Sequence, residues 1–557
     1  MRTTSFTRIT FLLLLYCAAS LHGQTNTVGM LLHDTAKAFR GYTLFAPVRS
    51  NTTYLIDNDG KLLRSWKSAY FPGQAAMLLP DGSLLRAAAA ESGHPFTAGG
   101  AAGRVERFDW SGTLTWSFDY FSDSYCTHHD VEVLPNGNIL LIAWMKKSLS
   151  EAAAAGRNLS GATYTEVWSE KVIEVQPTGS NGGVIVWEWD IWDHLVQDYD
   201  STKANYGIVS QHPELFDINF GDMKDDWLHI NSVRYNALRD EIILSVHATH
   251  EVWVIDHSTT KAEAAGHTGG KRGKGGDLLY RWGNPQAYKM GNATDQKLFA
   301  QHDARWIDAG YPGAGNILIF NNGPRRPGGA YSSIEEIVPP LAPDGSYERA
   351  TDSAFGPDRT AWTYKASPPA SFFALNVSGA TRLENGNTLI CDGPDGVFFE
   401  VTAAGEIVWR YINPVSITGP MTQGDRPMRN TVFKINRYAP DYAGVAGRDL
   451  TPGGTIELYP TGVKGEAGYP SEVTLYQNYP NPFNPVTTMR FSIPQREHVV
   501  LTVSDVMGRV VQTLIDGVLE AGSYELPFNA DGIMSGILLS RLRSGSATIS
   551  KSMMLLK

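Results

Sequence analysis

Cysteine and positive charge are both scarce in this sequence. Of its 557 residues three are cysteine, and Cys17 lies in an apolar N-terminal segment. The other two, Cys126 and Cys391, are able to pair in an oxidising compartment, but two cysteines do not make a disulfide framework. Acidic residues outnumber basic ones, 57 to 47, which gives a formal net charge of −10. A basic face for nucleic-acid phosphates is therefore missing, and no nucleic-acid partner is predicted.

The apolar N-terminal segment is too short to span a bilayer. Residues 11–19 are apolar, follow Arg2 and Arg8, and precede a plausible cleavage zone at 20–23. This order is typical of a cleavable export signal. We predict such a signal at residues 1–23, and no membrane span.

Motifs for metals and phosphates are missing as well. No HExxH or Cys/His spacing is present, so no metal and no cofactor are predicted, although His128-His129-Asp130 leaves metal binding open as a weaker alternative. A basic glycine loop at 266–276 lacks the Ser/Thr-terminated pattern of a phosphate loop. We interpret it as a solvated loop or as a cover for an anionic substrate. The acidic, aromatic insertion 190–227 is either a lid or a decorated edge.

Short strands joined by tight turns are abundant. Residues 376–413 hold four apolar runs, separated by Asn385-Gly386, by residues 393–396 and by Ala404-Gly405. Asn-Gly supplies the positive φ angles of a tight hairpin, and the flanking residues alternate or are β-branched. Four strands within about forty residues, joined by hairpins alone, are typical of one blade of a β-propeller.

This unit recurs along the chain. A glycine-containing turn followed by a strand that ends in tryptophan occurs six times. A tryptophan at a fixed place after the turn suits a large side chain wedged between neighbouring blades. The six are Trp66, Trp116, Trp187, Trp282, Trp362 and Trp409.

The repeat predicts an all-β fold, a six-bladed β-propeller over residues 30–445. One blade is expected to be split between the two ends of this region. Residues 41–66 supply three of its strands and residues 430–437 the fourth. Such a closure removes the open edges of the sheets.

A Pro/Gly-rich linker, 446–470, leads to a C-terminal segment, 471–557, for which a small β-sandwich is expected. The segment contains LYQNYPNPFNP at 475–485, DVMGRV at 505–510 and Ser535-Gly536-Ile537. On these motifs it resembles the type A sorting domain of the type IX secretion system. The resemblance implies the type IX secretion machinery as a partner. It also implies a protein that is secreted or held on the outer-membrane surface of a Gram-negative bacterium.

Polar residues stand at the starts of the predicted first strands, which line the central channel of a propeller. Histidine is frequent among them, and it acts as general acid, base or nucleophile near neutral pH. Any one of these histidines is equally readable as a hydrogen-bonded structural residue. The strand starts carry Gln74, His128-His129-Asp130, His229, His302-Asp303, Ser378 and Arg429.

Several blocks of sequence resemble the arylsulfate sulfotransferase family. They are DWLHINS at 226–232, QHDARW at 301–306, ILIFNNGPRR at 317–326, SGATRLENGNTL at 378–389 and GDLLYRWGNP at 276–285. Members of that family are six-bladed propellers that move a sulfuryl group between phenols without a nucleotide donor. The resemblance therefore implies a transferase whose substrate is a small aromatic sulfate or phenol.

The resemblance also implies roles for individual residues. His229 matches the channel histidine of a Trp-x-His-x-Asn-Ser motif, and His302 that of a Gln-His-Asp motif. Arg325 or Arg326 matches the arginine that clamps the sulfate, since a planar guanidinium fork suits an oxyanion. Further substrate-binding residues are predicted to be Asn231, Asp303, Arg326 and Arg429.

One position departs from the family. Its nucleophilic histidine, which is transiently sulfurylated, is expected where this chain has Ser378-Gly379-Ala380. His128 or His129 is the hypothesised replacement. Two other function classes stay open: a non-catalytic extracellular binding propeller, and a quinone-dependent oxidoreductase, whose propellers also carry Gly-turn-Trp repeats. Six blades and a ring of histidines disfavour the quinone-dependent oxidoreductase.

Overall fold

The computed structural model describes residues 26–90, 95–222, 224–459, 473–519 and 522–556. The predicted export signal at 1–23 and the part of the predicted linker from residue 460 onward lie outside the described residues. The chain divides into two compact units, Thr27–Leu458 and one that includes Tyr459–Lys557. None of the described helices is long and apolar enough to cross a membrane.

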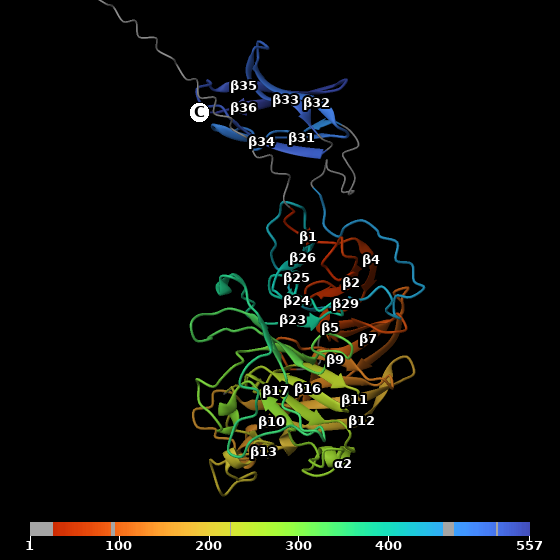
Figure 1. The fold of residues 1–557 in the computed structure, drawn as a ribbon, viewed down its shortest axis with the longest axis vertical. Coiled ribbons are helices and arrows are strands. Elements are labelled where there is room, and N and C mark those ends of the chain that lie inside the picture. Colours follow the sequence, from red (N-terminus) through yellow and green to blue (C-terminus); the bar gives the residue numbers. More distant parts are fainter. Residues whose placement is uncertain (1–25, 91–94, 223, 460–472, 520–521, 557) are drawn as a thin grey trace, which may run out of the picture. The chain divides into compact units, whose positions relative to one another are not determined.

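Small sheets, nearly all antiparallel, form most of the regular structure in the described part of unit Thr27–Leu458 (Figure 1). Six of these sheets hold four or five strands each. In strand order, three of them are β29 (Val432–Tyr438), β2 (Tyr42–Pro47), β3 (Thr52–Ile56), β4 (Leu62–Lys67); β5 (Pro72–Leu78), β6 (Leu84–Ala89), β7 (Gly103–Phe108), β8 (Leu114–Asp119); and β9 (Tyr125–Val133), β10 (Ile139–Ser148), β11 (Glu166–Thr178), β12 (Gly182–Asp190).

The other three sheets follow along the chain. They are β15 (Ile230–Asn236), β16 (Glu241–Val246), β17 (Glu251–Asp256), β18 (Tyr280–Trp282); β19 (His302–Trp306), β20 (Ile317–Asn321), β21 (Ser333–Ile337), β22 (Trp362–Tyr364); and β23 (Gly379–Arg382), β24 (Thr388–Asp392), β25 (Val397–Val401), β26 (Ile407–Ile412), β1 (Gly29–His33). Short elements connect them: α1 (Leu149–Ala154), η1 (Ile191–Asp193), β13 (Leu195–Val196), η2 (Val209–Gln211), β14 (Phe216–Asp217), α2 (Lys261–Ala264), η3 (Pro285–Tyr288), η4 (Pro369–Ser371), β27 (Val415–Ser416) and β28 (Gly419–Pro420).

One strand of each sheet faces its counterparts in the two neighbouring sheets. We call β29, β5, β9, β15, β19 and β23 the inner strands. Each contacts the next in this order, and β23 contacts β29 in turn, so the inner strands form a closed cycle. Residues at equivalent places on them are thereby brought together from distant parts of the sequence.

Strands from the two ends of this unit share a sheet, as the sequence predicts. β2 pairs with β29 in antiparallel register, from Tyr42 opposite Tyr438 to Pro47 opposite Val432. The four strands predicted within 376–413 are confirmed as β23 to β26. The pairing of β1 with β26 was not predicted. Such edge pairing depends on backbone groups rather than on a side-chain pattern.

The turn-and-tryptophan repeat forms a ring of hydrogen bonds, which we call the tryptophan clasps. Each tryptophan lies in the fourth strand of one sheet, and its indole Nε1–H donates to the connection between the third and fourth strands of the following sheet or, for Trp116, to the first residue of that fourth strand. The predicted wedge between neighbours is thereby confirmed. The bonds run from Trp66 to Asp109 O (2.9 Å), Trp116 to Gly182 O (2.8 Å), Trp187 to Thr259 Oγ1 (3.1 Å), Trp282 to Pro357 O (2.9 Å), Trp362 to Ala403 O (2.9 Å) and Trp409 to Asn58 O (2.8 Å).

His257 ties two sheets together by charge. It follows β17, and its Nδ1 lies 2.8 Å from Asp240 Oδ1 while its Nε2 lies 2.9 Å from Glu174 Oε2 in β11. Burial alone would lower the pKa of His257, but the hydrogen bonds and charges of Glu174 and Asp240 outweigh it and raise this pKa. The protonated ring therefore bridges two carboxylates.

The second unit has its own core. Its strands form one sheet of β30 (Thr474–Leu475), β31 (Val486–Ile493) and β34 (Gly522–Asn529), and another of β33 (Val510–Leu519), β32 (Glu497–Asp505), β35 (Gly536–Ser544) and β36 (Ala547–Leu555). Phe491 and Phe528 from the first sheet and Leu501 and Leu542 from the second belong to one hydrophobic cluster. Both sheets therefore bury a face against shared apolar side chains.

The two cysteines and the surface charges complete the description. Cys126 in β9 and Cys391 in β24 are both buried and free, so the pairing considered from the sequence is not formed.

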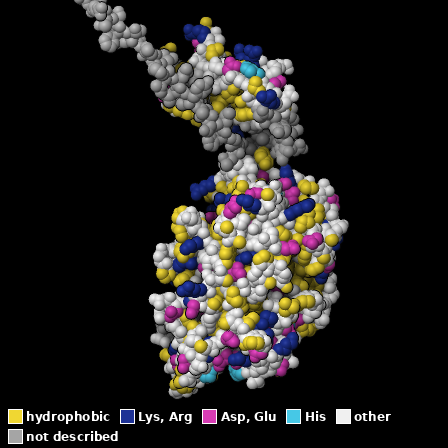
Figure 2. Space-filling view, in the orientation of Figure 1, with side chains coloured by type: hydrophobic (Ala, Val, Ile, Leu, Met, Phe, Trp, Pro, Cys, Tyr) yellow, Lys and Arg dark blue, Asp and Glu magenta, His cyan; other side chains and the backbone are white. Residues whose placement is uncertain are grey.

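Figure 2 shows basic and acidic side chains interspersed over the visible face of unit Thr27–Leu458.

Replacement of Trp409 by Phe tests the tryptophan clasps. The change removes the bond to Asn58 O and leaves a gap at a fully buried site, so we expect a loss of about 1–3 kcal/mol in unfolding free energy, measured by urea denaturation. Trp362→Phe is the matched control, because its bond lies at an exposed site and its loss should be smaller. Equal losses in the two variants would contradict this account.

His257 makes stability depend on pH. Because the folded protein raises its pKa, its contribution is fully present below the unfolded value of about 6.5 and is lost as pH rises through the folded value. Unfolding free energy should therefore fall less between pH 6 and pH 9 in His257→Gln than in the parent protein. His212→Gln, at a half-exposed histidine paired with Glu214, serves as control and should keep the parent's pH dependence.

Candidate active site

A residue with positive φ lies within, or up to three residues before, each inner strand. None of these residues is glycine, and a positive φ costs such a residue about 1–3 kcal/mol, which persists where the surrounding structure imposes it. Register shifts occur near them in β5, β9, β15 and β19, and such bulges re-aim side chains. The residues are Gln74 (φ 105°), His129 (54°), His229 (54°), Asp303 (50°), Ser378 (86°) and Arg429 (54°).

Four histidine rings follow one another beside these strand starts, and we call them the histidine arc. The ring centroids of His129 and His229 are 4.6 Å apart, those of His229 and His247 5.3 Å, and those of His247 and His302 5.5 Å. The members come from β9, from the residue before β15, from the residue after β16, and from β19. Three separate sheets thus contribute imidazoles to one place.

His229 is held by a carboxylate. Its Nδ1 lies 2.6 Å from Asp226 Oδ2, and its side chain is 16% exposed. Burial would raise the pKa of Asp226, but the hydrogen bond and charge of His229 outweigh it and lower this pKa, so Asp226 is ionised at neutral pH. An ionised carboxylate accepts the Nδ1–H, which leaves the lone pair of His229 at Nε2.

His302 has its proton fixed in the same way, by an amide. Its Nδ1 donates to Asn322 Oδ1 at 2.8 Å, while Asn322 Nδ2 donates to the carbonyl oxygens of Ala374 and Val377. Those carbonyls determine which way the amide points. Burial lowers the pKa of His302 to about 4, so the ring is neutral at pH 7 with its lone pair at Nε2.

His129 is the end of a buried chain that we call the Glu170 relay. Glu170 Oε2 lies 2.9 Å from His128 Nε2, and His128 Nδ1 lies 2.9 Å from His129 Nδ1. Each link needs one proton, so a neutral His128 donates at one nitrogen and accepts at the other. Burial raises the pKa of Glu170 well above its ordinary value. The protonated acid then donates to His128, His128 donates to His129, and His129 presents Nε2–H.

His128 itself is placed behind the arc. Both of its ring nitrogens are engaged in the Glu170 relay, its ring stacks on Trp144 at 4.0 Å, and 1% of the residue is exposed. Burial lowers the pKa of His128 and of His129 well below the ordinary value. His128 is therefore a positioning residue, while His129 belongs to the arc.

His247 and His250 were missed by sequence reasoning. Both follow β16, in the run SVHATH, and reasoning from the starts of the first strands passed over this end of the second strand. His247 Nδ1 is buried and has no hydrogen-bond partner among the described residues. His250 Nδ1 accepts the Ala300 N–H at 2.9 Å, so its Nε2 carries the proton. Burial lowers the pKa of His250 and the nearby charge of Arg325 lowers it further.

The predicted arginines have different surroundings. Arg325 is exposed, adopts positive φ (61°) and lies near enough to His250 to affect its pKa. Arg326 donates to Ser333 Oγ at 2.7 Å and stacks over Tyr331 at 4.2 Å, so its side chain is engaged with residues at the start of β21. Arg429 is exposed at the start of its inner strand.

Other predicted residues have their side chains engaged with protein. Asn231 Nδ2 donates to Gln301 O at 2.8 Å, and Asn231 is fully buried. Ser378 Oγ accepts the Gly393 N–H and donates to Asn376 O, so this hydroxyl supports a turn. It does not replace a nucleophile.

A buried group of charges adjoins the arc. Lys434 Nζ lies 2.7 Å from both oxygens of Asp130 and 3.5 Å from Asp303, which is also bonded to Arg305 at 2.9 Å. Arg234 reaches Asp130 at 2.9 Å and Asp303 at 3.5 Å. Burial would raise the pKa of Asp303, but the charges of Arg305, Lys434 and Arg234 lower it. Asp303 therefore joins inner strands instead of facing a ligand.

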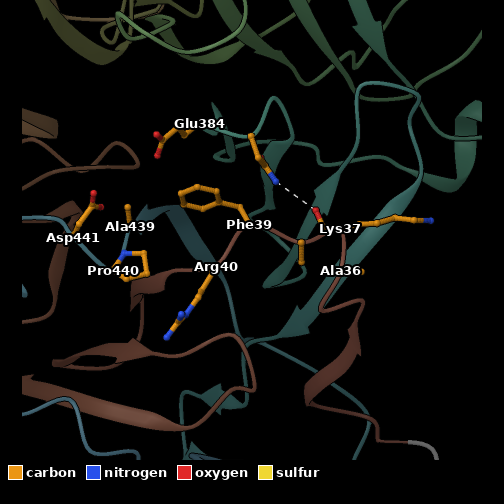
Figure 3. A pocket seen from close by; sticks show the side chains of 10 residues that line it. Ala36, Lys37, Phe39, Arg40, Glu384, Ala439, Pro440 and Asp441 are labelled. Atoms are coloured by element: carbon orange, nitrogen blue, oxygen red, sulfur yellow. Dashed lines mark hydrogen bonds between the residues drawn. The ribbon is translucent and has the colours of Figure 1, made fainter.

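The surface pocket in Figure 3 has a different lining. Its volume is about 500 Å³, and it includes Lys37, Phe39, Arg40 and Glu384, with Asn385 Nδ2 donating to Lys37 O. Histidine-arc residues are not part of this lining. The pocket's chemistry is a lysine, an arginine and two carboxylates at an outer surface, without the arc's oriented imidazoles.

Comparison with solved structures gives distant likenesses. A Bacteroides caccae protein of unknown function is 11% identical, with 72% of this chain and 98% of that chain covered and a TM-score of 0.38. A streptogramin B lyase is 9% identical, with 75% and 96% covered and a TM-score of 0.33. A putative 6-phosphogluconolactonase from Bacteroides fragilis is 10% identical, with 72% and 99% covered and a TM-score of 0.34. No activity follows from likenesses at this level.

Comparison with families and with curated proteins gives one clear result. No curated protein matches the chain significantly. The arylsulfotransferase family matches residues 45–417, which include the histidine arc, the Glu170 relay and Arg325. Since this match covers more than half of the 557 residues, the chain belongs to the arylsulfotransferase family and is a transferase of the sulfotransferase type.

Proposed function

We propose that this protein transfers a sulfuryl group between phenolic compounds at the histidine arc. The observation that carries the proposal is the pair of His229 and Asp226, in which a partly exposed imidazole has its Nδ1–H held at 2.6 Å and its Nε2 lone pair left for a substrate. The donor is a small aromatic sulfate and the acceptor a phenol.

The first step replaces the family's missing nucleophile by His229. Its Nε2 attacks sulfur, the N–S bond forms, and the bond from sulfur to the aryl oxygen breaks. Asp226 stabilises the positive charge that develops on the ring. The leaving aryl oxide takes the Nε2 proton of His129, while the proton of Glu170 moves to His128 and that of His128 Nδ1 moves to His129.

The second step reverses these movements. The acceptor phenol attacks sulfur, the N–S bond breaks, and the phenol proton passes to His129 Nε2 and restores the Glu170 relay. His302, with its lone pair at Nε2, lies at the other end of the arc and takes no part in this proton transfer. Arg325 and the Nε2–H of His250 face the negative charge on the sulfuryl oxygens.

The fold and the route of the protein are part of the same proposal. The closed cycle of inner strands supports six blades of a β-propeller over residues 30–445, with the arc in its channel. The two sheets within 471–557 support a β-sandwich of the type IX sorting kind. With the signal at 1–23 and the linker at 446–470, the proposed route is export by the type IX machinery, as a partner, to the medium or to the outer-membrane surface.

Covalent labelling tests the His229 step. The purified protein is mixed with p-nitrophenyl [³⁵S]sulfate without acceptor and quenched in alkali, because sulfurylated histidine is labile to acid. We expect close to one label per chain, none in His229→Ala, and slower labelling in Asp226→Asn. His212→Ala, a histidine outside the arc, should label like the parent.

Each other result has a defined meaning. Turnover to a phenol acceptor without any label would replace the covalent step by direct transfer with His229 as base. Binding of aryl sulfate without turnover would favour a binding propeller. Turnover unchanged in His229→Ala would overturn the site.

The Glu170 relay predicts a dependence on the leaving group. Glu170→Gln keeps a hydrogen bond to His128 but has no proton to pass on. Transfer from phenyl sulfate should fall by about 10²–10⁴-fold, because phenolate needs a proton as it leaves, while transfer from p-nitrophenyl sulfate should fall far less. Equal losses with both donors would show that Glu170 acts on folding or binding instead.

A further inference from the structure

We propose that His194, His267 and Asp277 form a binding site for a zinc-type divalent cation, at the base of the basic glycine loop. Their ligand atoms all lie within 4.8 Å of one another. A tetrahedral zinc ion with bonds of about 2.1 Å needs ligand atoms ~3.4 Å apart. The two 2.8 Å contacts of Asp277 Oδ1 must therefore lengthen when an ion binds. These residues lie in the insertion after β12 and in the connection between β17 and β18, not at a strand start.

The strongest sign is the orientation of His194. Its Nε2 lies 2.8 Å from Ala264 O, and a carbonyl only accepts, so Nε2 donates there. Nδ1 faces Asp277 Oδ1 at 2.8 Å, so this nitrogen and the carboxylate point to the same place. Donation of the second ring N–H to a backbone carbonyl is also the usual arrangement of a metal-bound histidine.

Asp277 contacts both histidines through one carboxylate oxygen. Its Oδ1 lies 2.8 Å from His267 Nδ1 as well as 2.8 Å from His194 Nδ1. The Asp277 side chain is nearly buried and that of His267 is 58% exposed. The site thus has two fixed ligands on a buried side and one adjustable ligand on the solvent side, through which an ion enters.

Backbone packing holds the site together. Trp189 Nε1 donates to Gly276 O at 2.7 Å, and the Trp189 ring stacks on His194. A Cβ at Gly276 would lie 2.0 Å from Ala264 O and 2.6 Å from His194 Nε2, so glycine is required for this approach. The glycine loop therefore returns tightly against His194, next to Asp277.

The donor set indicates the kind of ion. Two imidazoles and one carboxylate are ligands that Zn²⁺ takes at three positions, with water at a fourth, whereas Mg²⁺ and Ca²⁺ prefer all-oxygen sites. His267 and Asp277 bracket residues 268–276, and His194 belongs to the insertion at 190–227. A bound ion would pin the ends of the loop to that insertion.

The experiment measures zinc binding to the full chain without a histidine tag. Metal-free protein is dialysed against Zn²⁺, and metal content is read by mass spectrometry alongside the melting temperature. We expect one zinc per chain and a higher melting temperature, with both effects lost in His267→Ala and in Asp277→Asn. His212→Ala is the matched control, a half-exposed histidine beside a carboxylate in the same insertion, and it should bind like the parent.

Trypsin provides a second readout on the loop itself. Lys271, Arg272 and Lys274 lie within it, and zinc should slow cleavage there in the parent protein and not in His267→Ala. Absence of stoichiometric binding would overturn the proposal. So would zinc that binds equally well to His267→Ala, since the ion would then occupy another place. Ca²⁺ or Mg²⁺ giving the same protection would overturn the assignment to a zinc-type ion.

Discussion

The tryptophan clasps are the interaction on which the rest of the larger unit depends. Each indole N–H reaches from one sheet to a connection in the next, and the last bond, from Trp409 to Asn58 O, returns to the first sheet. In this cycle each of the six sheets is hydrogen-bonded to the sheet on either side of it. The clasps lie on the fourth strands, so they hold the sheets together on the side away from the inner strands.

That cycle of sheets is what makes the arc and the Glu170 relay possible. Left-handed residues at the strand starts are costly, and they persist because the cycle of sheets determines their backbone. The links of the Glu170 relay, both 2.9 Å, connect side chains of β9 and β11, and the adjoining arc draws its rings from three sheets. A hydrogen-bonded chain in a dry interior is sensitive to displacement, because a lost partner leaves a buried polar group unsatisfied.

Local repeats made much of this architecture predictable. The glycine turn before each tryptophan, the hairpins of 376–413 and the polar strand starts can each be recognised within a few residues of sequence. The residues that contact them in the fold cannot be recognised in this way. Glu170 and Asn322 orient histidines from other strands, and Arg325 and its neighbour Arg326 differ in their surroundings. Such pairings depend on register and burial, which carry no short-range signal, and the same is true of β1 on the edge of β26.

The pairing of β2 with β29 has a consequence for the order in which the chain is made. Arg437 and Thr43, which bond across these strands, are 394 residues apart in the sequence. A chain emerging from the ribosome therefore carries an incomplete first sheet until nearly the whole unit has been synthesised. Contacts of such long range form slowly, and an unfilled edge delays final compaction. This topology therefore postpones the last closure of the sheets to the arrival of one late strand, β29.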